Sequence, residues 1–104
     1  MKPLKTATAL LSSMLLASAI ASAQTTEALY KSKCTVCHGA DGTGTTPMGK
    51  KLVVRDFHSD EVSKMTDEEL FGITKKGKIK MPAYDKKLTD DQIKALVKYI
   101  RTLK

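Results

Sequence analysis

The sequence of 104 residues has no tryptophan, two phenylalanines, three tyrosines and two cysteines. So few aromatic side chains offer no platform on which nucleic-acid bases could stack, and the scattered basic residues argue against nucleic-acid binding as well. No stretch alternates apolar and polar residues as a half-buried strand would, and no segment is repeated. A small domain that lacks large core side chains commonly depends on a disulfide, a metal or a bulky cofactor.

The N-terminal segment has the pattern of a leader. MKPLK supplies two lysines, residues 7–20 form an apolar run, and the small residues Ala21-Ser22-Ala23 follow. This pattern is typical of a secretory signal peptide that is cleaved after Ala23. A permanent membrane anchor is disfavoured, because the run is shorter than the roughly 20 apolar residues that span a bilayer. The predicted organisation is therefore a cleavable signal peptide at 1–23 and one domain at 24–104, exported to the periplasm.

Helix-start signals occur at three places in the predicted domain. Thr25 or Thr26 can cap a first helix, and two capping boxes, Thr66–Glu69 and Thr89–Gln92, each open a further helix. Gly77 is the expected stop of the middle helix. The last helix carries an apolar face at 3.6-residue spacing: Ile93, Leu96, Val97, Ile100 and Leu103. Residues 39–47, GADGTGTTP, are predicted to form a loop, and residues 50–58 are compatible with one helical turn or an extended segment.

Residues 34–38 read CTVCH, a pattern with four interpretations. A redox dithiol of the thioredoxin type would follow a strand, and the sequence offers none. Zinc needs four ligands, of which this motif supplies three, with only His58 left over and no ligand-type residue near it. A disulfide between Cys34 and Cys37 would close a very small loop and leave His38 without a role.

The fourth interpretation, covalent haem attachment, accounts for all three residues. The two cysteines would form thioethers with the haem vinyl groups, and the adjacent histidine would bind the iron as its proximal ligand. Long loops are unusual in so small a domain, but they become reasonable if they wrap a large flat ligand. The sequence therefore predicts one covalent haem c with its iron, held by Cys34, Cys37 and His38.

With these motifs in place, the chain resembles the small monohaem c-type cytochromes of bacteria (cytochrome c family, class I). EALYKSKCTVCHGADGTG resembles the first helix, haem site and following loop of that family, KMPAY its distal methionine segment, and LVKYIRTL its last helix. The resemblance covers essentially all of residues 24–104. It implies an all-α, cytochrome c-like fold of three to four short helices and long loops wrapped around the haem.

Four residues are candidates for the sixth iron ligand. Met81 is favoured because Pro82 keeps it out of helical backbone, so that it can lie in a loop over the ring, and the family's ligand methionine has the same setting. Met65 precedes a helix cap and is expected to pack in the core, whereas Met48 follows the proximal histidine too closely. His58 would give a bis-histidine site of lower potential.

The resemblance also suggests roles for residues around the iron ligands. His38 would donate its second ring N–H to a backbone carbonyl, and Pro47 is the candidate acceptor. Tyr84 would hydrogen-bond near a haem propionate or simply pack against its surroundings. Tyr30 on the first helix is expected to meet Leu96 and Tyr99 where the first and last helices cross.

The predicted function is that of a soluble, exported electron carrier, not an enzyme. Sulfur ligation by Met81 favours ferrous iron, and an iron with both axial positions filled transfers electrons through the exposed haem edge. A haem subunit of a larger oxidase or dehydrogenase complex is the main alternative. A small haem peroxidase would need an open sixth position, and a sensor would need an output module.

Charge indicates the kind of partner. Without the two lysines of the predicted signal peptide, 16 basic and 11 acidic side chains remain, a net charge of +5. Some of the lysines in the segments expected to flank the haem edge would steer an acidic face of a redox partner, or would only keep the protein soluble. These are Lys50, Lys51, Lys75, Lys76, Lys78, Lys80, Lys86 and Lys87. We expect a monomer without stable membrane insertion after cleavage.

Overall fold

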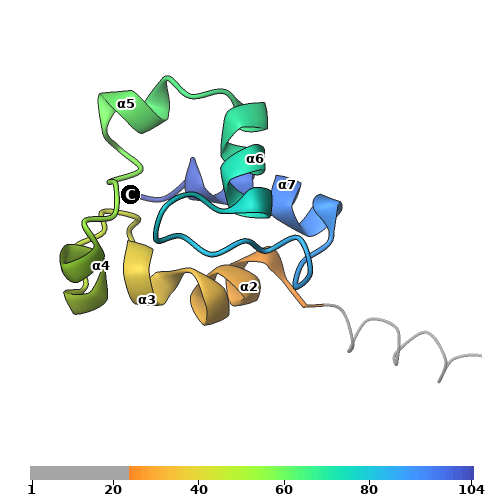
Figure 1. The fold of residues 1–104 in the computed structure, drawn as a ribbon, viewed down its shortest axis with the longest axis horizontal. Helices are drawn as coiled ribbons and strands as arrows, with labels where there is room; N and C mark the ends of the chain where they lie inside the picture. Colours follow the sequence, from red (N-terminus) through yellow and green to blue (C-terminus); the bar gives the residue numbers. More distant parts are fainter. Residues whose placement is uncertain (1–23) are drawn as a thin grey trace, which may run out of the picture.

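The computed structural model describes residues 24–104, so the predicted signal peptide at 1–23 lies outside the described residues. The described chain forms six helical elements and no strand (Figure 1). Their bounds are α2 Thr26–Lys33, α3 Thr35–His38, α4 Pro47–Leu52, α5 Asp60–Ser63, α6 Asp67–Lys76 and α7 Asp90–Ile100. The predicted all-α fold is confirmed. The count exceeds the predicted three to four because α3 and α5 are single turns of four residues each.

The helix starts follow the local signals in the sequence. Thr25 caps α2 by accepting a hydrogen bond of 3.1 Å from the amide of Ala28. Both predicted capping boxes are formed, at Thr66 with Glu69 before α6 and at Thr89 with Gln92 before α7. These caps satisfy backbone donors that no helical carbonyl can reach, which fixes the register of each helix.

Helix α4 resolves the segment that the sequence left ambiguous. Thr46 accepts a hydrogen bond of 2.9 Å from the amide of Gly49, and Pro47 occupies the first helical position, where its missing N–H costs nothing. The helix ends at Leu52, and the capping residue Val53 has a left-handed backbone with φ 55°. Residues 50–58 are thus partly helical, and the predicted loop ends one residue earlier than expected.

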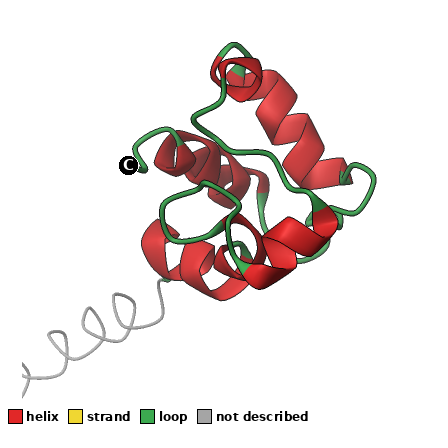
Figure 2. Ribbon diagram, turned by 90° about the vertical axis from the view of Figure 1, so that its left-hand side faces the viewer, coloured by secondary structure: helices red, strands yellow, loops and turns green. Residues whose placement is uncertain are grey.

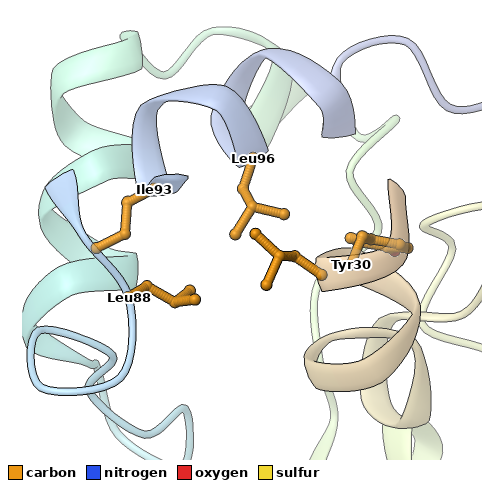
Figure 3. Packing of buried hydrophobic residues seen from close by; sticks show 5 residues of the cluster. Tyr30, Leu88, Ile93 and Leu96 are labelled. Atoms are coloured by element: carbon orange, nitrogen blue, oxygen red, sulfur yellow. The ribbon is translucent and has the colours of Figure 1, made fainter. Parts of the chain in front are cut away.

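The main core lies where α2 and α7 meet. Tyr30 is 1% exposed, and its ring centroid lies 5.3 Å from that of Tyr99, as the sequence predicted. Leu96, Ile93 and Leu88 complete this cluster with Leu29, and Figure 3 shows four of these residues with their labels. A second, smaller cluster of Val62, Leu70 and Val97 joins α5, α6 and α7.

The segment between α6 and α7 crosses the middle of the molecule. In Figure 1 it runs from the end of α6 toward α3 and then back along α2 to α7, and Figure 2 shows the loops from a second side. Tyr84 in this segment donates a hydrogen bond of 3.1 Å to the carbonyl of Lys33, which ties the segment to the end of α2. Among residues 24–104 no helix has the length and apolar character required to cross a membrane.

Candidate functional site

A cavity of about 450 Å³ lies between the helices, and each of the six contributes at least one residue to its wall. The predicted haem residues Cys34, Cys37 and His38 all line it, as do Met81 and Tyr84. Two thiols and an imidazole from consecutive turns of chain therefore share one cavity with a methionine that is more than forty residues away in the sequence.

The other candidates for the sixth ligand differ in position. Met65 lines the same cavity and also packs against the second core cluster, whereas Met48 and His58 are not part of the cavity wall. The His58 Nε2 atom lies 2.8 Å from the carbonyl oxygen of Asp41, in an exposed contact between two loops. Of the four candidates, only Met81 and Met65 are thus placed beside the cavity.

Helix α3 is held by hydrogen bonds to its last three carbonyl groups. The Thr46 hydroxyl donates to the carbonyls of Val36 and Cys37 at 2.7 and 3.1 Å. The amide of Gly44 donates to the carbonyl of His38 at 2.8 Å. Because a helix of four residues cannot hold its own shape, these contacts are what fix the CTVCH motif against the cavity.

Buried Tyr30 secures the residue after the motif. Its hydroxyl donates a hydrogen bond of 2.6 Å to the carbonyl of Gly39, and the burial of the phenol raises the pKa of Tyr30 well above its usual value. Gly39 has φ 82°, a backbone conformation that favours glycine. The first helix is therefore bound to the end of the haem motif through one short, enclosed hydrogen bond.

The properties of the two cysteines and the placement of possible metal ligands argue against a redox dithiol, a disulfide and a zinc site. Burial raises the pKa of the Cys34 thiol to about 11, with Lys33 lowering it and Cys37 raising it further, so this sulfur is not the activated thiolate of a redox dithiol. Both cysteines are free thiols in the structure. Within residues 24–104 no group of three or more His, Cys, Asp or Glu side chains is placed to hold a metal ion, so the structure does not support a zinc site.

The surroundings of His38 are compatible with a role as a metal ligand. Burial lowers the pKa of His38, which favours the neutral imidazole, the form that binds a metal. Its Nδ1 atom is enclosed and has no hydrogen-bond partner among the described residues. The hydrogen bond expected from His38 to Pro47 is therefore not formed, and Pro47, the first residue of α4, is not part of the cavity wall.

Met81 is presented on a tight turn. The amide and carbonyl of Lys78 form two hydrogen bonds with those of Met81, at 3.1 and 3.0 Å. Gly77 ends α6 with φ 76°, and a Cβ atom there would lie 2.7 Å from the carbonyl oxygen of Met81. The glycine predicted as a helix stop thus also makes room for the methionine segment.

Two β-branched residues on the cavity wall, Val53 and Ile79, have left-handed backbones with φ 55° and 57°. This conformation costs a residue with a Cβ roughly 1–2 kcal/mol. The two residues are 82% and 91% exposed, so burial within the chain does not offset that cost. Backbone strain of this kind clusters at functional sites, and here it marks the edge of the same cavity.

The cavity wall matches the chemistry of a haem. Leu70, Ile73 and Leu96 are among the apolar residues that line it, and the cationic side chains on the same wall are Lys33, Arg55, Lys78 and Lys80. An apolar ring with two propionate groups needs this combination, since the ring is stabilised by burial and the carboxylates by positive charge. The residues present therefore fit the group that the CTVCH motif predicts.

Three residues at the site were not identified from the sequence: Thr46, Gly49 and Phe57. A signal existed for Thr46, because a threonine directly before a proline is a common helix start. Gly49 approaches the backbone of Cys37 and Gly44, and Phe57 contacts the ring of His38. These contacts join residues at least five positions apart, and the sequence contains no local pattern for them.

A small helical fold built around a covalent haem motif defines the class of c-type cytochromes, and comparisons with known proteins agree. Residues 21–100 match the model of the family described as cytochrome c oxidase, cbb3-type, subunit III. The chain belongs to this family and carries covalently bound haem c with its iron. It takes part in electron transfer through that haem.

The chain is also similar to solved structures of c-type cytochromes. The c-type cytochrome KustC0563 is 34% identical, with a TM-score of 0.68, over 75% of this chain and 95% of that one. A tyrosine-to-phenylalanine mutant of Kustc0563 is 33% identical with the same TM-score, over 76% of this chain and 98% of its own. No curated protein sequence matches the chain.

Proposed function

We propose that the protein is a soluble, exported electron carrier whose haem iron is bound by His38 and Met81. The observation that carries the proposal is the shared cavity, to which both residues contribute together with Cys34 and Cys37. Haem iron supplies the one-electron chemistry. The chain attaches the ring through two sulfurs, fills both axial positions and surrounds the ring with apolar side chains, which raises the reduction potential and leaves no coordination site for a substrate.

Substitution of Met81 tests the axial ligand. We expect Met81→Ala to abolish the near-infrared band of methionine-bound ferric haem and to lower the reduction potential, because a sulfur ligand favours ferrous iron. Met65→Leu is the matched control, since Met65 lines the same cavity and should leave the band in place. A band that survives Met81→Ala and disappears with Met65→Leu would assign the ligand to Met65 instead.

The proposed partner is a redox protein with an acidic face. Lys78 and Lys80 are exposed and line the cavity, whereas Lys75 is half-exposed and forms an ion pair of 3.1 Å with Asp90. Of the predicted lysines, Lys78 and Lys80 are therefore best placed to meet a partner at the haem edge.

Charge reversal tests this steering. We expect Lys78→Glu with Lys80→Glu to slow bimolecular electron transfer to an acidic partner, on the order of tenfold at low ionic strength, since exposed charges act mainly on the association rate. The control is Lys94→Glu with Lys98→Glu, which changes the net charge by the same amount. Both residues are exposed on α7 and are not in the cavity wall. If both pairs slow the reaction equally, local steering is refuted.

Export is the remaining part of the proposal. The basic start and apolar run of residues 1–23 support cleavage after Ala23 and delivery to the periplasm. Mass spectrometry of the haem-loaded protein from the native host should therefore give the mass of residues 24–104 plus one haem. A mass that includes the first 23 residues would show that the leader is retained.

The family description favours one second candidate, a haem subunit of a larger complex. That description names an oxidase subunit, and a chain of this kind could serve within such an assembly. Gel filtration of gently extracted protein separates the two: a free carrier elutes as a monomer, and a subunit co-elutes with larger partners.

A further inference from the structure

The ring of Phe57 lies against the ring of His38. The two ring centroids are 4.5 Å apart and the planes are inclined by 23°, which is a stacked arrangement. His38 ends α3, whereas Phe57 belongs to the loop between α4 and α5, so the contact joins two separate parts of the fold. Both residues also line the cavity.

Phe57 is itself held firmly. Its amide donates a hydrogen bond of 2.9 Å to the carbonyl of Gly42, and its side chain packs against both core clusters. Gly42 has φ 77°, and a Cβ atom there would lie 2.7 Å from the Phe57 ring. The Phe57 side chain therefore has little freedom to move, and its ring can fix the orientation of the His38 ring.

The imidazole of His38 lacks the hydrogen bond that usually orients a ligand histidine. In most metal sites the ligand histidine is oriented by a hydrogen bond from its second ring nitrogen. Here the enclosed Nδ1 atom has no partner among residues 24–104, while the backbone of His38 is fixed by Cys34 and Gly44. Rotation of the ring about its own side-chain bonds is then limited chiefly by the face of Phe57.

We propose that Phe57 is the positioning residue of the proximal iron ligand: its stacked ring sets the plane of the His38 imidazole relative to the haem. This inference rests on the proposed function, in which His38 binds the iron. The plane of an axial imidazole determines how the iron d orbitals split, and that splitting is visible in the ferric protein by EPR and in the shifts of the haem methyl groups by NMR.

The test compares two phenylalanines in the haem-loaded protein. Phe71 packs against the same two core clusters as Phe57, but it is not part of the cavity wall. We expect Phe57→Leu to change the ferric g values and the order or spread of the haem methyl shifts. Phe71→Leu should lower thermal stability to a similar degree and leave both spectra unchanged.

Conservative variants complete the design. Phe57→Tyr retains a stacking face and should keep the wild-type spectra. Phe57→Met also removes the ring, and it takes the place of Phe57→Leu if the leucine variant does not incorporate haem. The proposal is overturned if Phe57→Leu or Phe57→Met changes stability alone, or if Phe57→Tyr shifts the spectra as strongly as leucine does. If wild-type protein shows no low-spin, histidine-bound ferric haem, the proposed ligation fails first and this inference with it.

Discussion

Gly49→Ala is expected to destabilise the protein by about 3 kcal/mol, a large effect for the addition of one methyl group. A Cβ atom at Gly49 would lie 2.3 Å from the carbonyl oxygen of Cys37 and 2.4 Å from that of Gly44. Both contacts are with backbone, so no side-chain rotation can relieve them. The helix α4 would have to move away from α3, and the haem motif would lose part of its support.

Gly72→Ala is the matched control. Gly72 lies inside α6, and nothing outside its own helix lies within 4 Å of the position that its Cβ would take. Alanine should therefore stabilise the helix there by about 1 kcal/mol, the usual difference in helix propensity. Chemical unfolding of the haem-loaded variants measures both changes. Equal stability of the Gly49 and Gly72 variants would contradict the close approach of α4 to α3.

The features that the sequence predicted correctly are those coded over a few residues. The two capping boxes and the Gly77 stop follow from side chains within one or two turns, whereas the crossing of Tyr30 with Tyr99 was expected from the family resemblance. The CTVCH motif likewise predicted the covalent haem, which the family confirms, from five residues. Such patterns survive tertiary packing because they stabilise structure locally.

The remaining features depend on contacts between distant segments. The stack of Phe57 on His38 joins residues 19 positions apart, and the position of the Phe57 ring depends further on the backbone of Gly42. The hydrogen bond expected from His38 to the Pro47 carbonyl is not formed, and the Phe57 ring is stacked against the imidazole. A short motif predicts the ligand, but contacts between distant segments decide how its ring is placed.

Tyr30 gives the second large expected effect, which depends on pH. The tyrosine is 1% exposed, and burial raises its pKa above the usual value of 10. Below pH 10 the phenol is protonated in both the folded and the unfolded chain, so its titration does not affect stability. Above pH 10 the unfolded chain releases this proton and the folded protein keeps it, so stability falls as the pH rises.

Tyr30→Phe should remove this fall while it weakens the protein at neutral pH. The free energy of unfolding of the wild type should drop by up to about 1.4 kcal/mol for each pH unit above 10 relative to the variant. At pH 7 the variant should be less stable by about 1–1.5 kcal/mol, because the 2.6 Å hydrogen bond to Gly39 is lost. The two stability curves should therefore approach and cross in the alkaline range.

Tyr84→Phe is the control. The pKa of Tyr84 is also raised by burial, but this residue is only half-buried and should contribute a smaller slope. Parallel curves for wild type and Tyr30→Phe between pH 9 and 12 would show that the phenol ionises as readily in the folded protein as in the unfolded chain.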